Sequence, residues 1–117
     1  MSSIVDELKG IQAELLEERK RLSNLEKRLS SLNVGARAHA ELYAWKAFLD
    51  VLLFESAAII RYAESGSLLA ASIASCELAS RIGSRVASIE QNIFMSEARA
   101  VIVNLLHASR SLCSLSS

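Results

Sequence analysis

The side chains with reactive chemistry are few and widely spaced in this sequence of 117 residues. Neither of its two histidines, His39 and His107, has a second histidine or a cysteine three or four residues away, as a metal site on one helix requires. The sequence also lacks a glycine-rich phosphate loop and the HExxH, CxxC and GxSxG motifs. We therefore expect no metal, no cofactor and no enzymatic activity.

Three polar residues near the C-terminus fall on one predicted helix. His107 and Arg110 are three residues apart, and Arg99 lies two turns before them. Such a group could contact a phosphate, although cations near the end of a helix also stabilise its dipole. We keep Arg99, His107 and Arg110 as a candidate polar site.

A second polar group would matter only if the fold gathered its members in one pocket. It consists of Glu18, Lys46 and Asp50, of which the last two are four residues apart and are expected to pair on one helix. A small enzyme built on this cluster is a further hypothesis.

The two cysteines, Cys76 and Cys113, are far apart and have no metal-type spacing. We expect two half-buried free thiols in the reducing environment of the cytoplasm. A disulfide between helices is the alternative, and it would suit the cytoplasm of a hyperthermophile. No membrane helix is expected, because the most apolar segment, 47–60, is too short to span a bilayer and contains two acidic residues.

The composition predicts an all-helical fold. The chain has no proline and four glycines, and its residues are 51 % hydrophobic but only 5 % aromatic. We expect a single domain over residues 1–117, an antiparallel four-helix bundle with helices at about 3–32, 36–64, 68–92 and 97–112. Three long helices are the alternative if the last two are continuous. The formal net charge is zero, so no overall field favours nucleic acid.

The first predicted helix, 3–32, carries a coiled-coil seam. Its apolar residues alternate in steps of four and three, and Glu18 occupies the one missing position. The seam consists of Ile4, Leu8, Ile11, Leu15, Leu22, Leu25, Leu29 and Leu32. Because this helix is longer than the last one, we expect part of the seam, either from Leu22 to Leu32 or from Ile4 to Leu15, to contact a second copy or a partner. The interface candidates are Leu22, Leu25, Leu29 and Leu32.

The second predicted helix is apolar on almost every side, which is typical of a central helix or of one buried against a second copy. Gly35 is expected in the left-handed position after the first helix, and Gly66 in the turn after the second. Ser67 and Ser96 are expected to cap the third and fourth helices, with Glu97 in the first turn of the fourth.

Small residues line one side of the third predicted helix in two neighbouring ridges. The ridges are Ala71, Ser75, Ala79, Gly83 and Ala87, followed by Ser72, Cys76, Ser80, Ser84 and Ser88. Ridges of this kind allow two helix axes to approach closely. We expect them to pack against the side of the second helix that carries Trp45 and Phe48, or against another copy, with Ala79 and Gly83 as interface candidates.

The hairpin over residues 44–85 combines Tyr62, the Gly66 turn, two apolar residues, Ala70 and a spaced pattern that ends in LASRIG. It resembles small archaeal helical-hairpin proteins of unknown function and the HEPN helical bundles, which include partners of nucleotidyltransferases and toxin ribonucleases. The ribonuclease branch carries an arginine four to six residues before a histidine, and no arginine precedes His39 or His107 at that distance. The resemblance therefore implies a non-catalytic bundle. Tetratricopeptide hairpins share the pattern, but no second copy is present to form an array.

We expect a soluble, cytoplasmic assembly or adaptor protein that forms a homo-oligomer or binds a helical protein partner. The alternative is a nucleic-acid-associated bundle of the HEPN type, acting as a toxin, an antitoxin or a nucleotidyltransferase partner.

Overall fold

The computed structural model describes residues 2–32 and 35–116, and all its regular structure is helical, which confirms the all-α prediction. Its α-helices are α1 (Ser2–Ser31), α2 (Ala36–Glu64), α3 (Leu68–Gly83), α4 (Val86–Gln91) and α5 (Arg99–Cys113), followed by the short 3-10 helix η1 (Ser114–Ser116). The molecule is elongated, with principal extents of 49 × 23 × 18 Å.

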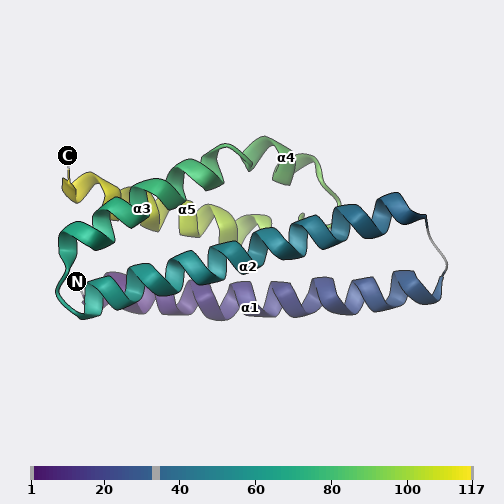
Figure 1. The fold of residues 1–117 in the computed structure, drawn as a ribbon, viewed down its shortest axis with the longest axis horizontal. Coiled ribbons are helices and arrows are strands. Elements are labelled where there is room, and N and C mark those ends of the chain that lie inside the picture. Colours follow the sequence, from purple (N-terminus) through teal and green to yellow (C-terminus); the bar gives the residue numbers. More distant parts are fainter. Residues whose placement is uncertain (1, 33–34, 117) are drawn as a thin grey trace.

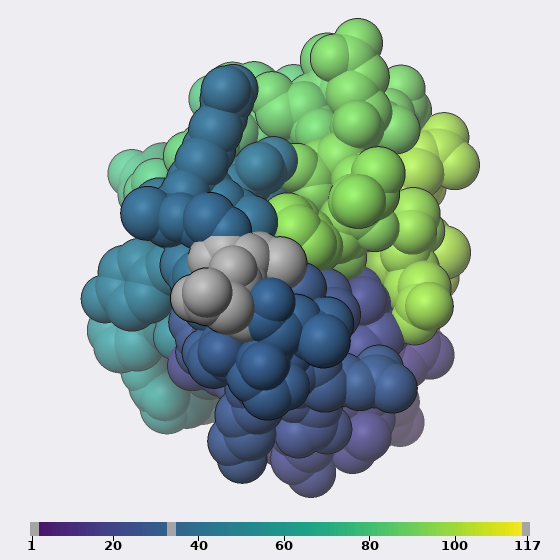
Figure 2. All heavy atoms as spheres, turned by 90° about the vertical axis from the view of Figure 1, so that its right-hand side faces the viewer, coloured from purple at the N-terminus to yellow at the C-terminus, as the bar shows by residue number. Residues whose placement is uncertain are grey.

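The four longer helices lie side by side, and each runs opposite to the one before it (Figure 1). Helix α1 packs against α2, α2 against α3, α3 against α5, and α5 against α1. Figure 2 looks onto the end where α1 meets α2, and there the α4–α5 segment in green covers the remaining side. The helices therefore surround one common core.

The core is built from aliphatic side chains of these four helices. Four of the eight seam residues of α1 are buried in it and three more are half-buried against it, because α2 and α5 cover α1 from two sides. The fully buried large side chains are Leu8, Leu15, Leu22, Leu42, Leu49, Leu52, Ile59, Leu78, Ile82, Met95, Ile102 and Leu105. At about 25 cal/mol per Å² of apolar surface, burial of such side chains is the main source of stability.

The turn between α2 and α3 has the form that its sequence predicts. Gly66 has a φ of +83°, a value that side chains with a Cβ rarely adopt. The amide of Ser67 donates to the carbonyl of Tyr62 at 2.9 Å and that of Gly66 to Ala63 at 3.2 Å, which closes α2 with a Schellman motif. The short turn makes α2 and α3 antiparallel neighbours, although no side-chain hydrogen bond caps α3 at Ser67.

Gly35 does not have the predicted left-handed conformation. Its φ is −63° and it precedes the first residue of α2 as the N-cap. The two residues before it, Asn33 and Val34, lie outside the described part of the chain.

The predicted continuous helix over 68–92 is wrong, because α3 ends at Gly83 and α4 begins at Val86. Glycine and serine at this point are poor helix formers, and Arg85 leaves the helical path to lie over two aromatic rings. The guanidinium carbon of Arg85 is 5.9 Å from the ring centroid of Trp45 and 5.5 Å from that of Phe48.

The last long helix also begins later than predicted, at Arg99, with Ala98 rather than Ser96 as its N-cap. Contacts with α1 explain the difference. Arg21 donates a 2.8 Å hydrogen bond to the carbonyl of Phe94 and pairs with Glu97 at 3.1 Å. The buried Met95 anchors the same segment in the core, so tertiary contacts hold it in turns.

The first part of the second small ridge, Ser72 and Cys76, contacts α5, whereas Ser80 and Ser84 lie beside Phe48. Ser72 donates a 2.8 Å hydrogen bond to the carbonyl of Leu112. Cys76 and Cys113 form a disulfide, with 4.7 Å between their Cα atoms. The prediction of free thiols is therefore wrong, since the small residues bring the two helices close enough for this bond.

No helix among the described residues has both the length and the apolar character needed to cross a membrane. The cytoplasmic location stays a prediction. The disulfide is typical of oxidising compartments and of hyperthermophile cytoplasms.

Candidate functional site

A groove runs between α2 and α3 on the outside of the molecule, with a volume of about 610 Å³. Small side chains from both sides open it, namely Ala44 and Ala47 of α2, Ser80 of α3 and Ser84, which follows the end of α3. Because these side chains are small, they leave open a space between the helices that larger side chains would fill.

Aromatic and charged groups form the rest of the groove. Phe48 lines it, and Trp45 packs edge-on against Phe48 with 5.7 Å between the ring centroids. Arg85 lies over both rings, while Arg81 pairs with Glu55 of α2 at 3.0 Å. A second hollow of about 440 Å³, which is lined in part by Glu41 and Asn92, shares Ala44 and Arg85 with the groove.

The outer face of α2 is apolar and borders this groove. Residues spaced by three or four positions occupy one side of the helix, opposite the core, and we call them the outer stripe. The outer stripe consists of Tyr43, Ala47, Val51, Phe54, Ala58 and Tyr62. The exposed fractions are 72 % for Phe54, 68 % for Tyr43, 42 % for Tyr62 and 38 % for Val51, so three aromatic rings face solvent on one helix.

The interface candidates on α1 are less accessible than the sequence predicted. Leu22 is fully buried in the chain's own core, because the segment before α5 packs against α1 at this point, where the carbonyl of Phe94 accepts a hydrogen bond from Arg21. Leu25 and Leu29 are half-buried against that core, and only Leu32, at 71 % exposure, is free of it. The uncovered part of the seam is therefore confined to its last residue.

The interface candidates on α3 have different surroundings. Ala79 is half-buried and packs against the core. Gly83 is exposed, and a Cβ added there would have no atom within 4 Å. No close helix contact therefore involves Gly83 among the described residues, and its effect is to end α3 beside the groove.

The candidate polar residues of α5 do not converge on a pocket. Arg99 pairs with Glu90 of α4 at 3.1 Å. His107 and Arg110 are exposed on the outside of α5. No group of three His, Cys, Asp or Glu side chains among the described residues is arranged to hold a metal ion.

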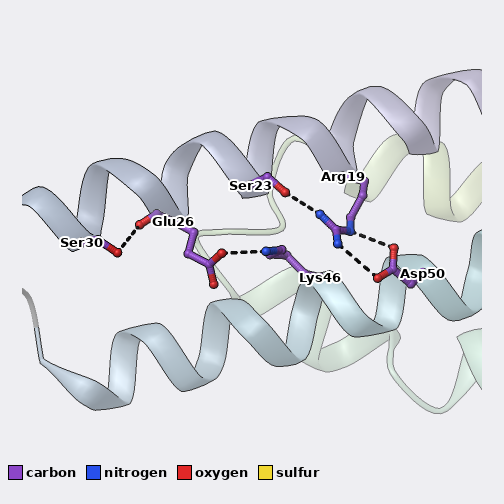
Figure 3. A network of polar contacts seen from close by, with 6 residues as sticks. All are labelled: Arg19, Ser23, Glu26, Ser30, Lys46 and Asp50. Atoms are coloured by element: carbon purple, nitrogen blue, oxygen red, sulfur yellow. Dashed lines mark hydrogen bonds and ion pairs between the residues drawn. The ribbon is translucent and has the colours of Figure 1, made fainter.

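The cluster of Glu18, Lys46 and Asp50 does not form, and neither does the predicted pair of Lys46 with Asp50. Each of the three pairs with a different residue instead, and the partners of Lys46 and Asp50 are on α1. Figure 3 shows two of these interhelical pairs, Arg19 with Asp50 at 2.8 Å and Lys46 with Glu26 at 2.7 Å. Glu18 pairs with Arg21 on its own helix at 2.8 Å.

These pairs also affect protonation. The hydrogen bond from Lys46 holds the pKa of Glu26 below its ordinary value. The hydrogen bond to Glu64 raises the pKa of Lys9 in the same way at the other end of the α1–α2 contact. These two ion pairs therefore link α1 to α2.

Sequence reasoning missed the outer stripe, although its signal was present. The second predicted helix was recognised as apolar on almost every side, but the part opposite the core was not separated from the rest. The spacing of the three aromatic residues, at steps of eleven and eight, places them on one face of a helix.

No family model, no curated protein and no solved structure matches this chain.

Proposed function

We propose that this chain is a non-catalytic four-helix-bundle protein, in which α4 is an interruption, and that it acts by protein–protein association as an assembly or adaptor module. The observation that carries the proposal is the outer stripe of α2. Large exposed apolar residues scattered singly are ordinary on a protein surface, but a continuous row beside a groove is typical of an interaction site.

The chemistry of the stripe supports a helical partner. Tyrosine and phenylalanine supply large contact areas, and Ala47 and Ala58 between them leave room for a second helix to approach. Interface energy is concentrated in a few aromatic anchors of this kind. Phe54, the most exposed of the three rings, is therefore the residue on which association should depend most.

The alternative of a nucleic-acid-associated bundle stays a prediction. The basic residues Lys9, Arg19, Lys20, Arg21, Lys46, Arg81 and Arg99 each pair with an acidic residue. Binding to phosphates would require these pairs to open.

A photo-crosslinking experiment tests the proposed function. A benzophenone amino acid replaces Phe54, and in a matched control it replaces Ile93, which is 81 % exposed and lies outside the stripe. In cells of the source organism, we expect a protein adduct of defined mass from position 54 and none from position 93. The proposal is refuted if position 54 gives no adduct, or if both positions give the same adducts.

A further inference from the structure

The arrangement of residues along the outer stripe is symmetric about its midpoint. From one end to the other the steps are four, four, three, four and four residues. The residues at matching distances from the midpoint are also alike: a tyrosine at each end, Tyr43 and Tyr62, then Ala47 and Ala58, then Val51 and Phe54 in the centre.

An interface between two identical copies related by a two-fold axis has this property. In such an interface, residue i of one copy contacts residue j of the other, and j contacts i. For two antiparallel helices the sum of i and j is constant. Every matching pair of the outer stripe shares one sum, so a single register aligns all six residues.

We propose that the partner of the outer stripe is a second copy of this chain, with the two α2 helices antiparallel. The register places the tyrosine at the end of one stripe beside the tyrosine at the start of the other, and the two alanine pairs opposite each other. The proposal deepens the proposed function and rests on it, since it names the partner of the same surface.

The groove between α2 and α3 fits this arrangement. Two of its lining residues, Ala47 and Val51, belong to the outer stripe, and the register places them opposite Ala58 and Phe54 of the second copy. The small residues Ala44 and Ala47 leave space beside Val51 for the ring of Phe54, which is 72 % exposed in the single chain. The groove and the Phe54 ring are therefore a complementary pair that occurs twice in the dimer.

The exposed area is sufficient for a small interface. At about 200 Å² for each aromatic side chain, the exposed fractions of Tyr43, Phe54 and Tyr62 amount to about 360 Å² per copy and about 720 Å² for two. Stable interfaces bury about 1,200 Å² or more in total. The three rings thus provide over half of that area before Val51, the alanines and the groove are added.

Sedimentation velocity of the purified chain is the first test. We expect a species of about 25 kDa, twice the chain mass of 12.7 kDa. Phe54→Glu and Val51→Glu should each raise the dissociation constant by more than about tenfold, with unchanged helical content by circular dichroism. Ile93→Glu, which places the same charge outside the stripe, should leave the dimer intact. A monomeric wild type, or a dimer that both stripe variants retain, overturns the proposal.

Cross-linking tests the register. In the Ala47→Cys/Ala58→Cys variant, the two new cysteines lie about 16 Å apart within one helix, too far for a bond in the same chain. An antiparallel dimer brings position 47 of one copy beside position 58 of the other, so mild oxidation should link the chains. Ala47→Cys alone should give no link, whereas a link from this single variant indicates parallel helices and overturns the antiparallel register.

The outcomes separate this inference from the proposed function. If the wild type is monomeric and the probe at position 54 links to a different protein, association through the stripe stands and the second copy is excluded. If the wild type is monomeric and the probe gives no adduct, both proposals fail.

Discussion

Removal of the disulfide between α3 and α5 should destabilise the protein strongly. The Cys76→Ala/Cys113→Ala variant opens a loop whose ends are 37 positions apart in sequence. The chain-entropy relation for a loop of this length gives about 4 kcal/mol at room temperature, because the cross-link restricts the unfolded chain. A domain of this size has a free energy of unfolding of about 5–15 kcal/mol, so the variant should remain folded but lose a large part of its stability.

Urea unfolding measures this effect, with the fluorescence of Trp45, the only tryptophan, and far-ultraviolet circular dichroism as two probes. Trp45 of α2 is buried and Arg85 lies over its ring, so its emission reports loss of the core. The variant should unfold at lower urea with a steeper dependence, since its unfolded state exposes more surface. Wild type in excess dithiothreitol should match the variant. Two reactive thiols in the denatured, unreduced wild type would refute the reasoning, as would identical curves with and without reductant.

Three further predictions concern single groups. Ser109→Ala should raise the free energy of unfolding by about 1 kcal/mol, because its buried hydroxyl has no hydrogen-bond partner among the described residues, whereas Ser72→Ala should lower it by about 1 kcal/mol. Gly66→Ala should lower it by about 1 kcal/mol, because the left-handed turn disfavours a Cβ. Because the pKa of Glu26 is lower in the folded state than its ordinary value of 4.5, the charged Glu26 stabilises the fold at pH values above 4.5. This stability is lost as the pH falls through the pKa of the folded state. Urea unfolding at neutral pH checks the serine and glycine variants. Unfolding over a series of acidic pH values, with wild type and Lys46→Gln, checks the prediction for Glu26.

Each of these predictions would be contradicted by a specific result. Equal stabilities for the two serine variants would mean that Ser72 and Ser109 have equivalent surroundings. An unchanged stability for Gly66→Ala would contradict the left-handed conformation. If the Lys46→Gln variant loses as much stability in acid as the wild type, the contact with Glu26 does not lower that pKa.

Composition and the spacing of apolar residues predicted the helical structure but did not locate every helix end. The observed bounds of α2 equal those predicted, because a glycine lies just outside each end of the helix. The ends of α3 and α5 depend on contacts that are distant in sequence. Arg85 lies over the rings of α2, and Arg21 of α1 holds the segment before α5, so neither boundary is encoded nearby.

The candidate site was harder to predict for the same reason. Leu22 was expected at an interface because the length of α1 suggested an uncovered seam, but the segment before α5 extends the cover. Cys76 and Cys113 were expected to be free because their spacing carries no information on how closely α3 and α5 pack. The spacing of Tyr43, Phe54 and Tyr62 places them on one face of α2, but only the position of the core shows that this face is exposed to solvent.

The disulfide has a consequence for proteolysis. It closes residues 76–113 into a covalent ring that contains α4, the turns over 92–98 and the exposed Arg85. A protease that cuts within this ring opens it without releasing α5, because the fragment stays tied to α3 through sulfur. The nicked chain keeps its mass apart from one added water, and its two pieces separate only when a reductant breaks the bond.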